Sequence, residues 1–245
     1  MNLIRSYWQQ SKSPFYSLIF TIPLLVTYEI MIFSFNHSDI IGLRNGADVL
    51  FRQFFAVFNI YGFYIVGFVV LSALLVSYYF YSKHEIYGKF QGKFFILMIL
   101  ESLLYALVMF IVVDKIGKFL MSTPSGNIFP VEGANPDTNR LIALALGAGV
   151  YEEFIFRVLL VSGCLFFLRD LLKFNSLVSV ILSVLFASLV FSIFHYLGDF
   201  GEVFELKSFL VRFGAGIFLS ALYALRGYGI TAYTHTFYDL IVIML

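Results

Sequence analysis

Long apolar runs separated by short polar stretches dominate the chain. A helix needs about 20 predominantly apolar residues to cross the hydrocarbon core of a bilayer. On this rule we expect an all-α, polytopic transmembrane helix bundle, because open strands would leave backbone groups without hydrogen bonds in lipid. The seven expected spans lie near residues 15–35, 60–81, 94–113, 141–168, 176–196, 208–225 and 229–245.

Two further stretches shape the expected organisation. Residues 48–57 form a shorter apolar segment, which predicts an interfacial helix or part of an eighth span. The longest polar connection, residues 121–140, is rich in Gly, Pro and Asn and predicts a loop. It divides the chain into N-terminal transmembrane helices, residues 1–120, and a core of four helices, residues 141–245.

Composition supports the membrane interpretation. Mean hydropathy is +0.90, and charged residues make up 13% of the chain, about half the share usual in a globular domain. Such a chain cannot cover a water-facing surface, so we expect a multi-pass integral membrane protein. The net charge of +1 gives no basis for nucleic-acid binding. A single cysteine, Cys164, excludes an intramolecular disulfide.

Ionisable residues inside apolar runs are the exceptions, because each costs several kcal/mol unless it is paired or lines a polar cavity. Four of them are scattered, and we interpret them as structural. Two lie near span ends, where they can reach the interface or each other. The other two are isolated, and we expect protonated or hydrogen-bonded groups. The span-end residues are Asp114 and Arg212, and the isolated ones are Glu29 and Glu101.

Two adjacent glutamates and an arginine stand within GVYEEFIFRVLL, residues 149–160. Glu153 and Arg157 are four residues apart, so on a helix they can pair on one face. Glu152 then points about 100° away and has no local cation of its own. This geometry predicts two roles: Glu153 is held by Arg157, and Glu152 is left to face a cavity.

Two later helices add further polar pairs at helical spacing. FSIFH places Phe191 and His195 on one face, and HTFYD does the same for His235 and Asp239. A buried glutamate can take a proton from water, and histidines can orient that water or stabilise an oxyanion. Asp239 could accept a hydrogen bond from His235 or from a substrate backbone. Two histidines with a carboxylate and water could also hold zinc. The alternative is purely structural, with these groups as inter-helix contacts and Phe191 as a core residue.

Three motifs stand in order on successive apolar helices. EEFIFR fits EExxxR, FSIFH fits FxxxH, and HTFYD fits HxxxN/D. In these motifs the chain resembles the type II CAAX prenyl proteases and bacteriocin-processing proteins (the CPBP or Abi family), which are intramembrane peptidases. The resemblance covers about residues 140–245, and the first three spans match nothing specific. It implies an endopeptidase that hydrolyses peptide bonds of a membrane-associated protein or peptide.

The resemblance also implies a set of site residues. Glu152 would activate the attacking water, Arg157 would position Glu153, and the remaining groups would complete the water and oxyanion site. Asp239 stands where Asn is the other residue of the motif, and an ionised aspartate cannot donate to an oxyanion. The implied site consists of Glu152, Glu153, Arg157, His195, His235 and Asp239.

We expect no required cofactor, because one glutamate base with an oriented water suffices. Zinc is the alternative, and it would tolerate aspartate at the last position better. Its ligands would come from His195, His235, Glu152 and Asp239.

The compact chain, without a soluble domain, resembles the bacterial members of this family. We therefore expect a multi-pass protein of a bacterial cell membrane, with the lipid bilayer and a membrane-associated substrate as partners and no nucleic acid. A proton-coupled transporter is the alternative from another class, since Glu and His side chains can relay protons. A non-catalytic binding protein on the same scaffold is the third possibility.

Depth in the membrane constrains how these groups can meet. Glu152 lies about eleven residues into its expected helix, at a rise of 1.5 Å per residue. His235 enters from the opposite side, about six residues into the last span. The two reach a common level only if the last helix is tilted or begins deeper in the membrane.

Overall fold

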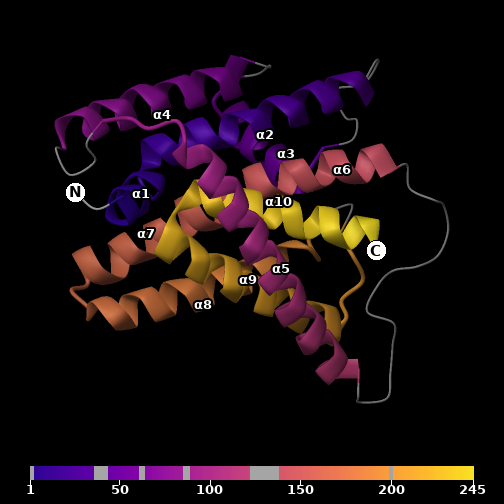
Figure 1. The fold of residues 1–245 in the computed structure, drawn as a ribbon. Helices are drawn as coiled ribbons and strands as arrows, with labels where there is room; N and C mark the ends of the chain where they lie inside the picture. Colours follow the sequence, from indigo (N-terminus) through magenta and orange to yellow (C-terminus); the bar gives the residue numbers. More distant parts are fainter. Residues whose placement is uncertain (1–2, 36–43, 61–63, 85–88, 122–137, 199–200) are drawn as a thin grey trace.

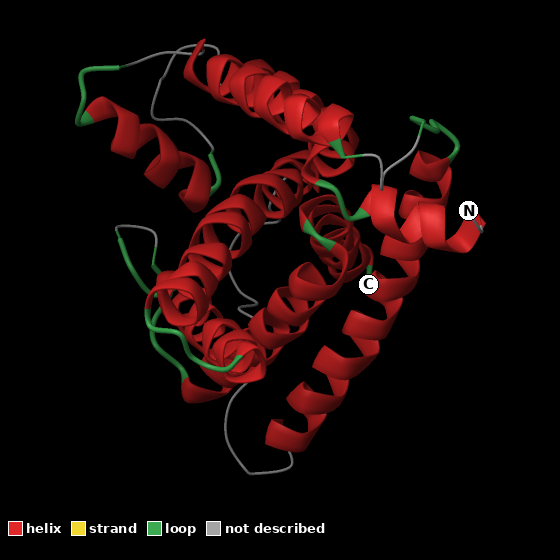
Figure 2. Cartoon of the chain, turned by 90° about the vertical axis from the view of Figure 1, so that its left-hand side faces the viewer, coloured by secondary structure: helices red, strands yellow, loops and turns green. Residues whose placement is uncertain are grey.

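The computed structural model describes residues 3–35, 44–60, 64–84, 89–121, 138–198 and 201–245. In these parts of the chain every regular element is helical (Figures 1 and 2). The expected all-helical fold class is therefore confirmed for the described residues. Most of the loop expected at 121–140, namely residues 122–137, lies outside the described residues, and residues 138–140 are helical.

Five of the described helices precede residue 122. The apolar stretch at 48–57 forms part of a short helix of 11 residues, too short to cross a bilayer. Asn45 begins this helix, because its side chain accepts the Ala47 N–H at 2.8 Å, as a preferred N-cap residue does. The five are α1 (Leu3–Ser11), α2 (Pro14–Phe35), α3 (Gly46–Ala56), α4 (Tyr64–Lys83) and α5 (Phe94–Met121).

The chain after the loop begins with a long helical segment that alternates between α and π geometry. The sequence predicts one α-helix over 141–168, whereas the structure has three π-helical stretches there. Turns of this kind occur frequently at functional sites, and they change the angle between successive side chains. The elements are α6 (Thr138–Gly147), η2 (Ala148–Glu152), η3 (Phe154–Val161), α7 (Ser162–Leu165), η4 (Phe166–Leu171), α8 (Ser176–Phe194), α9 (Leu206–Arg226) and α10 (Tyr228–Met244).

Several helices are suited to a membrane. The outer faces of α4 and α5 expose large apolar side chains such as Phe68, Leu75 and Leu104, as lipid contact requires. Among the described residues, five helices have the length and apolar composition to cross a bilayer, namely Pro14–Phe35, Ile65–Lys83, Phe94–Leu120, Ser176–Phe194 and Leu206–Arg226. The two other expected spans fall on the segment with π turns and on α10, which has 17 residues. The count of seven stays a prediction.

Helix α10 lies inside the bundle, in contact with α2, α5, α9 and η2 (Figure 1). Gly227, with φ of 80°, ends α9 and lets α10 start at once in a new direction. Residues 228–236 are all buried, so α10 begins within the protein. A last helix that is tilted or begins deeper in the membrane stays a prediction.

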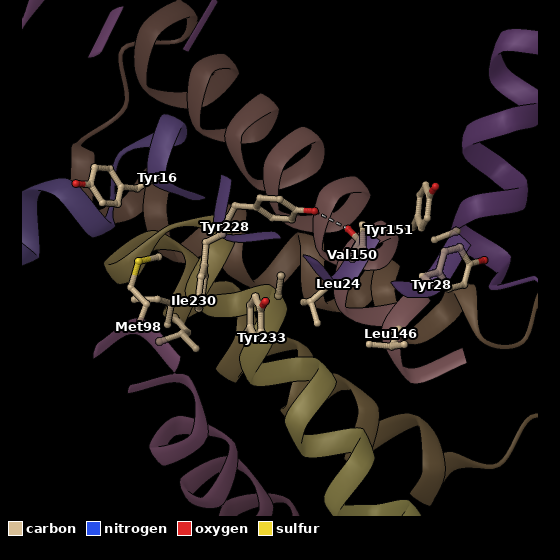
Figure 3. Close-up of a cluster of buried hydrophobic side chains, with 14 of the residues drawn as sticks. Tyr16, Leu24, Tyr28, Met98, Leu146, Val150, Tyr151, Tyr228, Ile230 and Tyr233 are labelled. Atoms are coloured by element: carbon tan, nitrogen blue, oxygen red, sulfur yellow. Dashed lines mark hydrogen bonds between the residues drawn. The ribbon is translucent and has the colours of Figure 1, made fainter. Parts of the chain in front are cut away.

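Aromatic side chains fill the core around the start of α10 (Figure 3). The Tyr228 hydroxyl donates to the backbone oxygen of Val150 at 3.0 Å. The Tyr233 ring stacks on Phe20 with centroids 4.1 Å apart. These contacts fix α10 against η2 on one side and α2 on the other.

Two of the scattered glutamates are paired with arginines. Glu29 accepts from Arg52 at 2.7 Å. Glu101 accepts from Arg226 through both carboxylate oxygens, at 2.5 and 2.7 Å, and also from the Tyr7 hydroxyl. Both are therefore hydrogen-bonded groups, as one of the two expectations had it, but neither is isolated. Their partners lie far along the sequence, where a pattern within one helix cannot reveal them.

The two residues near span ends have separate partners. Asp114 forms an ion pair with Lys118 one turn further along α5, at 2.7 Å. Arg212 pairs with Glu202 at 2.5 Å, just before α9 begins. The sequence predicts that these two residues reach the membrane interface or each other. Each is instead paired with a residue close to it in the sequence.

Candidate active site

The helix that carries the two motif glutamates packs very closely against its neighbours. A Cβ built on Gly149 would lie 1.9 Å from Oγ1 of Thr236 on α10. A Cβ built on Gly147 would lie 2.6 Å from the Tyr28 ring and 2.8 Å from Cβ of Asn45. The two glycines therefore let η2 approach α10 on one side, and α2 with the cap of α3 on the other.

The second glutamate lies at the centre of a buried charged cluster. Glu153 and Arg157 form the expected ion pair, with Oε1 and Nη1 2.9 Å apart and both side chains fully buried. Nδ1 of His235 lies 2.6 Å from the same Oε1 atom. The Phe191 ring covers the guanidinium at 4.5 Å from its centroid. Within the described residues, Nε, Nη1 and Nη2 of Arg157 all lack a hydrogen bond, so the charge of Glu153 and the ring of Phe191 supply most of its compensation.

The first glutamate has a neutral partner. Oε1 of Glu152 accepts a hydrogen bond from Nδ2 of Asn45 at 2.8 Å, although the sequence predicted no partner for it. The residue is 7% exposed. The two adjacent carboxylates therefore differ as expected: one is bound to an arginine and the other is not.

The FxxxH motif places a histidine beside this pair. Nδ1 of His195 lies 2.9 Å from the backbone oxygen of Phe191. Because a carbonyl only accepts, this contact assigns the proton to Nδ1 and leaves the lone pair of a neutral ring on Nε2. The Phe191 ring lies 4.9 Å from the ring of His195 and 6.2 Å from that of His235. Phe191 is thus the buried core residue of the structural alternative, and its ring contacts both histidines.

The two residues of the last motif, His235 and Asp239, do not form the hydrogen bond that was one of the expectations for them. His235 directs Nδ1 at Glu153, and its Nε2 lies 3.6 Å from Oδ2 of Asp239. That distance is within ion-pair range but too long for a hydrogen bond. Asp239 is therefore not a hydrogen-bond partner of His235 here, because the ring is held by a glutamate on another helix.

The described side chains form no cluster of metal ligands. Over the residues that the structure describes, no three His, Cys, Asp or Glu side chains are grouped so that they could hold a metal ion. The Nδ1 contacts of His235 and His195 leave Nε2 of both rings available, so these contacts do not decide the question. We derive no step through a metal, and metal independence stays a prediction.

Asn45 is the member of this site that the sequence did not reveal. It lies in the N-terminal part, 107 residues before its partner Glu152, and belongs to no recognised motif. The only signal was its position directly before a helix, which indicates a cap. A cap alone does not predict a contact with a glutamate on another helix.

Comparison with known proteins gives one match. Residues 135–241 match a family model described as type II CAAX prenyl endopeptidase Rce1-like. No curated protein and no solved structure matches the chain. The matched segment contains all three motifs, which confirms the resemblance. Through residues 135–241 the chain is similar to the Rce1-like family of type II CAAX prenyl endopeptidases, which are proteases, and five of its described helices are suited to a membrane.

Proposed function

We propose that this protein is an intramembrane endopeptidase in which Glu152 activates the water that attacks a peptide bond. The observation that carries the proposal is the difference between two neighbouring buried carboxylates. Glu153 is occupied by Arg157 and His235, at 2.9 and 2.6 Å. Glu152 is held at one oxygen by a neutral amide, at 2.8 Å. Oε2 of Glu153 also has no hydrogen-bond partner among the described residues, but this side chain is fully buried and its charge is compensated by the Arg157 guanidinium. Glu152 is held by a neutral amide and is 7% exposed, so it is the carboxylate better placed to take a proton from water.

The reaction begins when Glu152 takes a proton from water. The hydroxide oxygen bonds to the carbonyl carbon of the substrate, and the carbonyl oxygen becomes an oxyanion. When the C–N bond breaks, Glu152 returns the proton to the leaving amine. General acid–base catalysis of this kind contributes about 10²- to 10⁴-fold to the rate.

The two histidines support this step in different ways. His195 is anchored through Nδ1 to the Phe191 backbone, so its Nε2 can accept a hydrogen bond from the attacking water. His235 is anchored through Nδ1 to Glu153. When Nε2 is also protonated, it can donate to the oxyanion, and such a donor contributes roughly 10²- to 10³-fold.

Asp239 supplies negative charge beside His235 in this scheme. An ionised carboxylate cannot donate to an oxyanion. Its Oδ2 lies 3.6 Å from Nε2 of His235, so its charge favours a protonated ring in that position. We assign Asp239 to the support of His235 and not to the oxyanion itself.

The proposed substrate is a peptide or protein associated with the membrane. The protein is similar to a protease family, and the apolar outer faces of its long helices fit a bilayer. Glu152, Glu153 and His235 are buried, whereas His195 and Asp239 are partly exposed, so a peptide segment has to enter among helices to reach the glutamates. A substrate already held in the bilayer has the shortest path.

A reconstituted assay tests this function. The purified protein in liposomes is incubated with a library of membrane-tethered peptides in H₂¹⁸O, and products are analysed by mass spectrometry. We expect cleaved peptides with one ¹⁸O atom in the new carboxylate, because water is the nucleophile. Proton uptake without any cleaved peptide would support a transporter and contradict the proposal.

A further inference from the structure

Asn45 joins the N-terminal helices to the catalytic glutamate through both ends of its amide. Oδ1 accepts the backbone N–H of Ala47 at 2.8 Å, and Nδ2 donates to Oε1 of Glu152 at 2.8 Å. The first contact fixes the orientation of the amide, since a backbone N–H needs an acceptor. The donor group is therefore the one that faces Glu152.

A buried polar network holds the cap itself in place. The backbone N–H of Asn45 donates to the Tyr28 hydroxyl at 3.1 Å, and this hydroxyl donates to Asp48 at 2.9 Å. Asp48 is fully buried and accepts from Arg44 at 2.6 Å and from Arg52 at 2.7 Å. A side chain locked by such contacts can fix the geometry of the group that it binds.

The same network reaches the catalytic helix at a second point. Arg52 also donates to Glu29 at 2.7 Å. The same Glu29 oxygen, Oε1, accepts from the Tyr151 hydroxyl at 2.7 Å. Because Tyr151 directly precedes Glu152, the N-terminal helices hold η2 at two successive residues.

We propose that Asn45 is a positioning residue of the active site, which holds Oε1 of Glu152 so that Oε2 is presented to the attacking water. The helices before residue 60 thereby complete a site whose motifs all lie within residues 135–241. This inference rests on the proposed role of Glu152 as the base. Asn45 itself touches neither water nor substrate in this scheme.

If Asn45 were only a helix cap, other preferred N-cap residues would replace it without loss of activity. Asp and Ser are also preferred N-cap residues, so Asn45→Asp and Asn45→Ser both keep the acceptor for the Ala47 N–H. Both lose the amide donor to Glu152. Asp keeps the shape of Asn but adds a negative charge, whereas Ser is smaller and adds no charge. Comparing the two variants therefore separates the effect of shape from the effect of charge.

The test measures kcat, KM and melting temperature of both variants with a membrane-tethered peptide that the wild-type protein cleaves. We expect kcat to fall about 10- to 100-fold, as for a reacting group misplaced by about 1 Å. KM stays near the wild-type value because the cap is kept. The melting temperature falls only slightly for Asn45→Ser and more for Asn45→Asp, because the latter sets a second carboxylate against Glu152. Wild-type kcat in either variant would overturn the proposal. A loss of kcat that only parallels a loss of melting temperature would also overturn it, since that is a structural effect.

A parallel measurement on Glu152→Gln separates this inference from the proposed function. If Glu152→Gln is inactive while Asn45→Ser and Asn45→Asp are fully active, Glu152 is the base and the positioning role of Asn45 is wrong. If Glu152→Gln keeps its activity, the proposed function fails first, and the positioning role fails with it.

Discussion

One added methyl group at Gly149 would test the close packing on which the site depends. In Gly149→Ala the new Cβ would lie 1.9 Å from Oγ1 of Thr236 and 2.6 Å from the backbone oxygen of Ala232. The Thr236 hydroxyl can rotate away, but the Ala232 carbonyl is part of α10. Because non-bonded carbon contacts are most favourable near 3.5 Å, η2 and α10 have to separate by about 1 Å.

That separation would reach the charged cluster directly. His235 lies next to Thr236 on α10, and its Nδ1 is 2.6 Å from Oε1 of Glu153. An increase of about 1 Å takes this contact past the length of a hydrogen bond. Overpacking costs about 1–3 kcal/mol, which lowers the melting temperature by about 2–12 °C at 2–4 °C per kcal/mol. Misplacement of about 1 Å at a catalytic site lowers kcat by about 10²-fold.

Gly163→Ala is the matched control, because it lies on the same helical segment with nothing within 4 Å of its Cβ. We expect this variant to keep wild-type kcat, with unchanged or slightly raised melting temperature, since Ala favours helix over Gly. The assay is peptide cleavage in liposomes together with thermal unfolding. Wild-type kcat and melting temperature for Gly149→Ala would refute the close approach of η2 to α10.

Further predictions concern the buried ion pair and metal. Arg157→Ala should lower stability by about 3–5 kcal/mol, because Glu153 is left buried without its cation; an unchanged thermal unfolding profile would contradict this. Arg157→Lys keeps the charge but loses the planar group that stacks on Phe191, so an intermediate loss is expected in the same measurement. Protein purified in chelator should retain its activity and contain no zinc by elemental analysis. Stoichiometric zinc that is lost together with activity would contradict metal independence.

Contacts within one helix could be predicted from the sequence. The spacing of Glu153 and Arg157 determines that they share a face, and the structure brings them to 2.9 Å. The length of the apolar runs likewise predicted long membrane-type helices, and five are present among the described residues. Such features depend only on helical geometry and local composition.

Contacts between helices could not be predicted in the same way. The spacing of His235 and Asp239 suggested that the two might pair, but the ring is bound to Glu153, 82 residues away. Asn45 and Glu152 are 107 residues apart. No periodicity in a single sequence reports which helices pack together. The π turns also went unpredicted, because apolar periodicity does not separate them from an α-helix.

The most direct measurement compares cleavage of one membrane-tethered peptide by the wild-type protein, Glu152→Gln and Glu153→Gln. Glutamine has the shape of glutamate but cannot take a proton from water, so Glu152→Gln should lose about 10²-fold or more in kcat at wild-type KM and melting temperature. Glu153→Gln should instead lose stability first, because it leaves the fully buried Arg157 uncompensated. Undiminished cleavage by Glu152→Gln would contradict the assignment of Glu152 as the base.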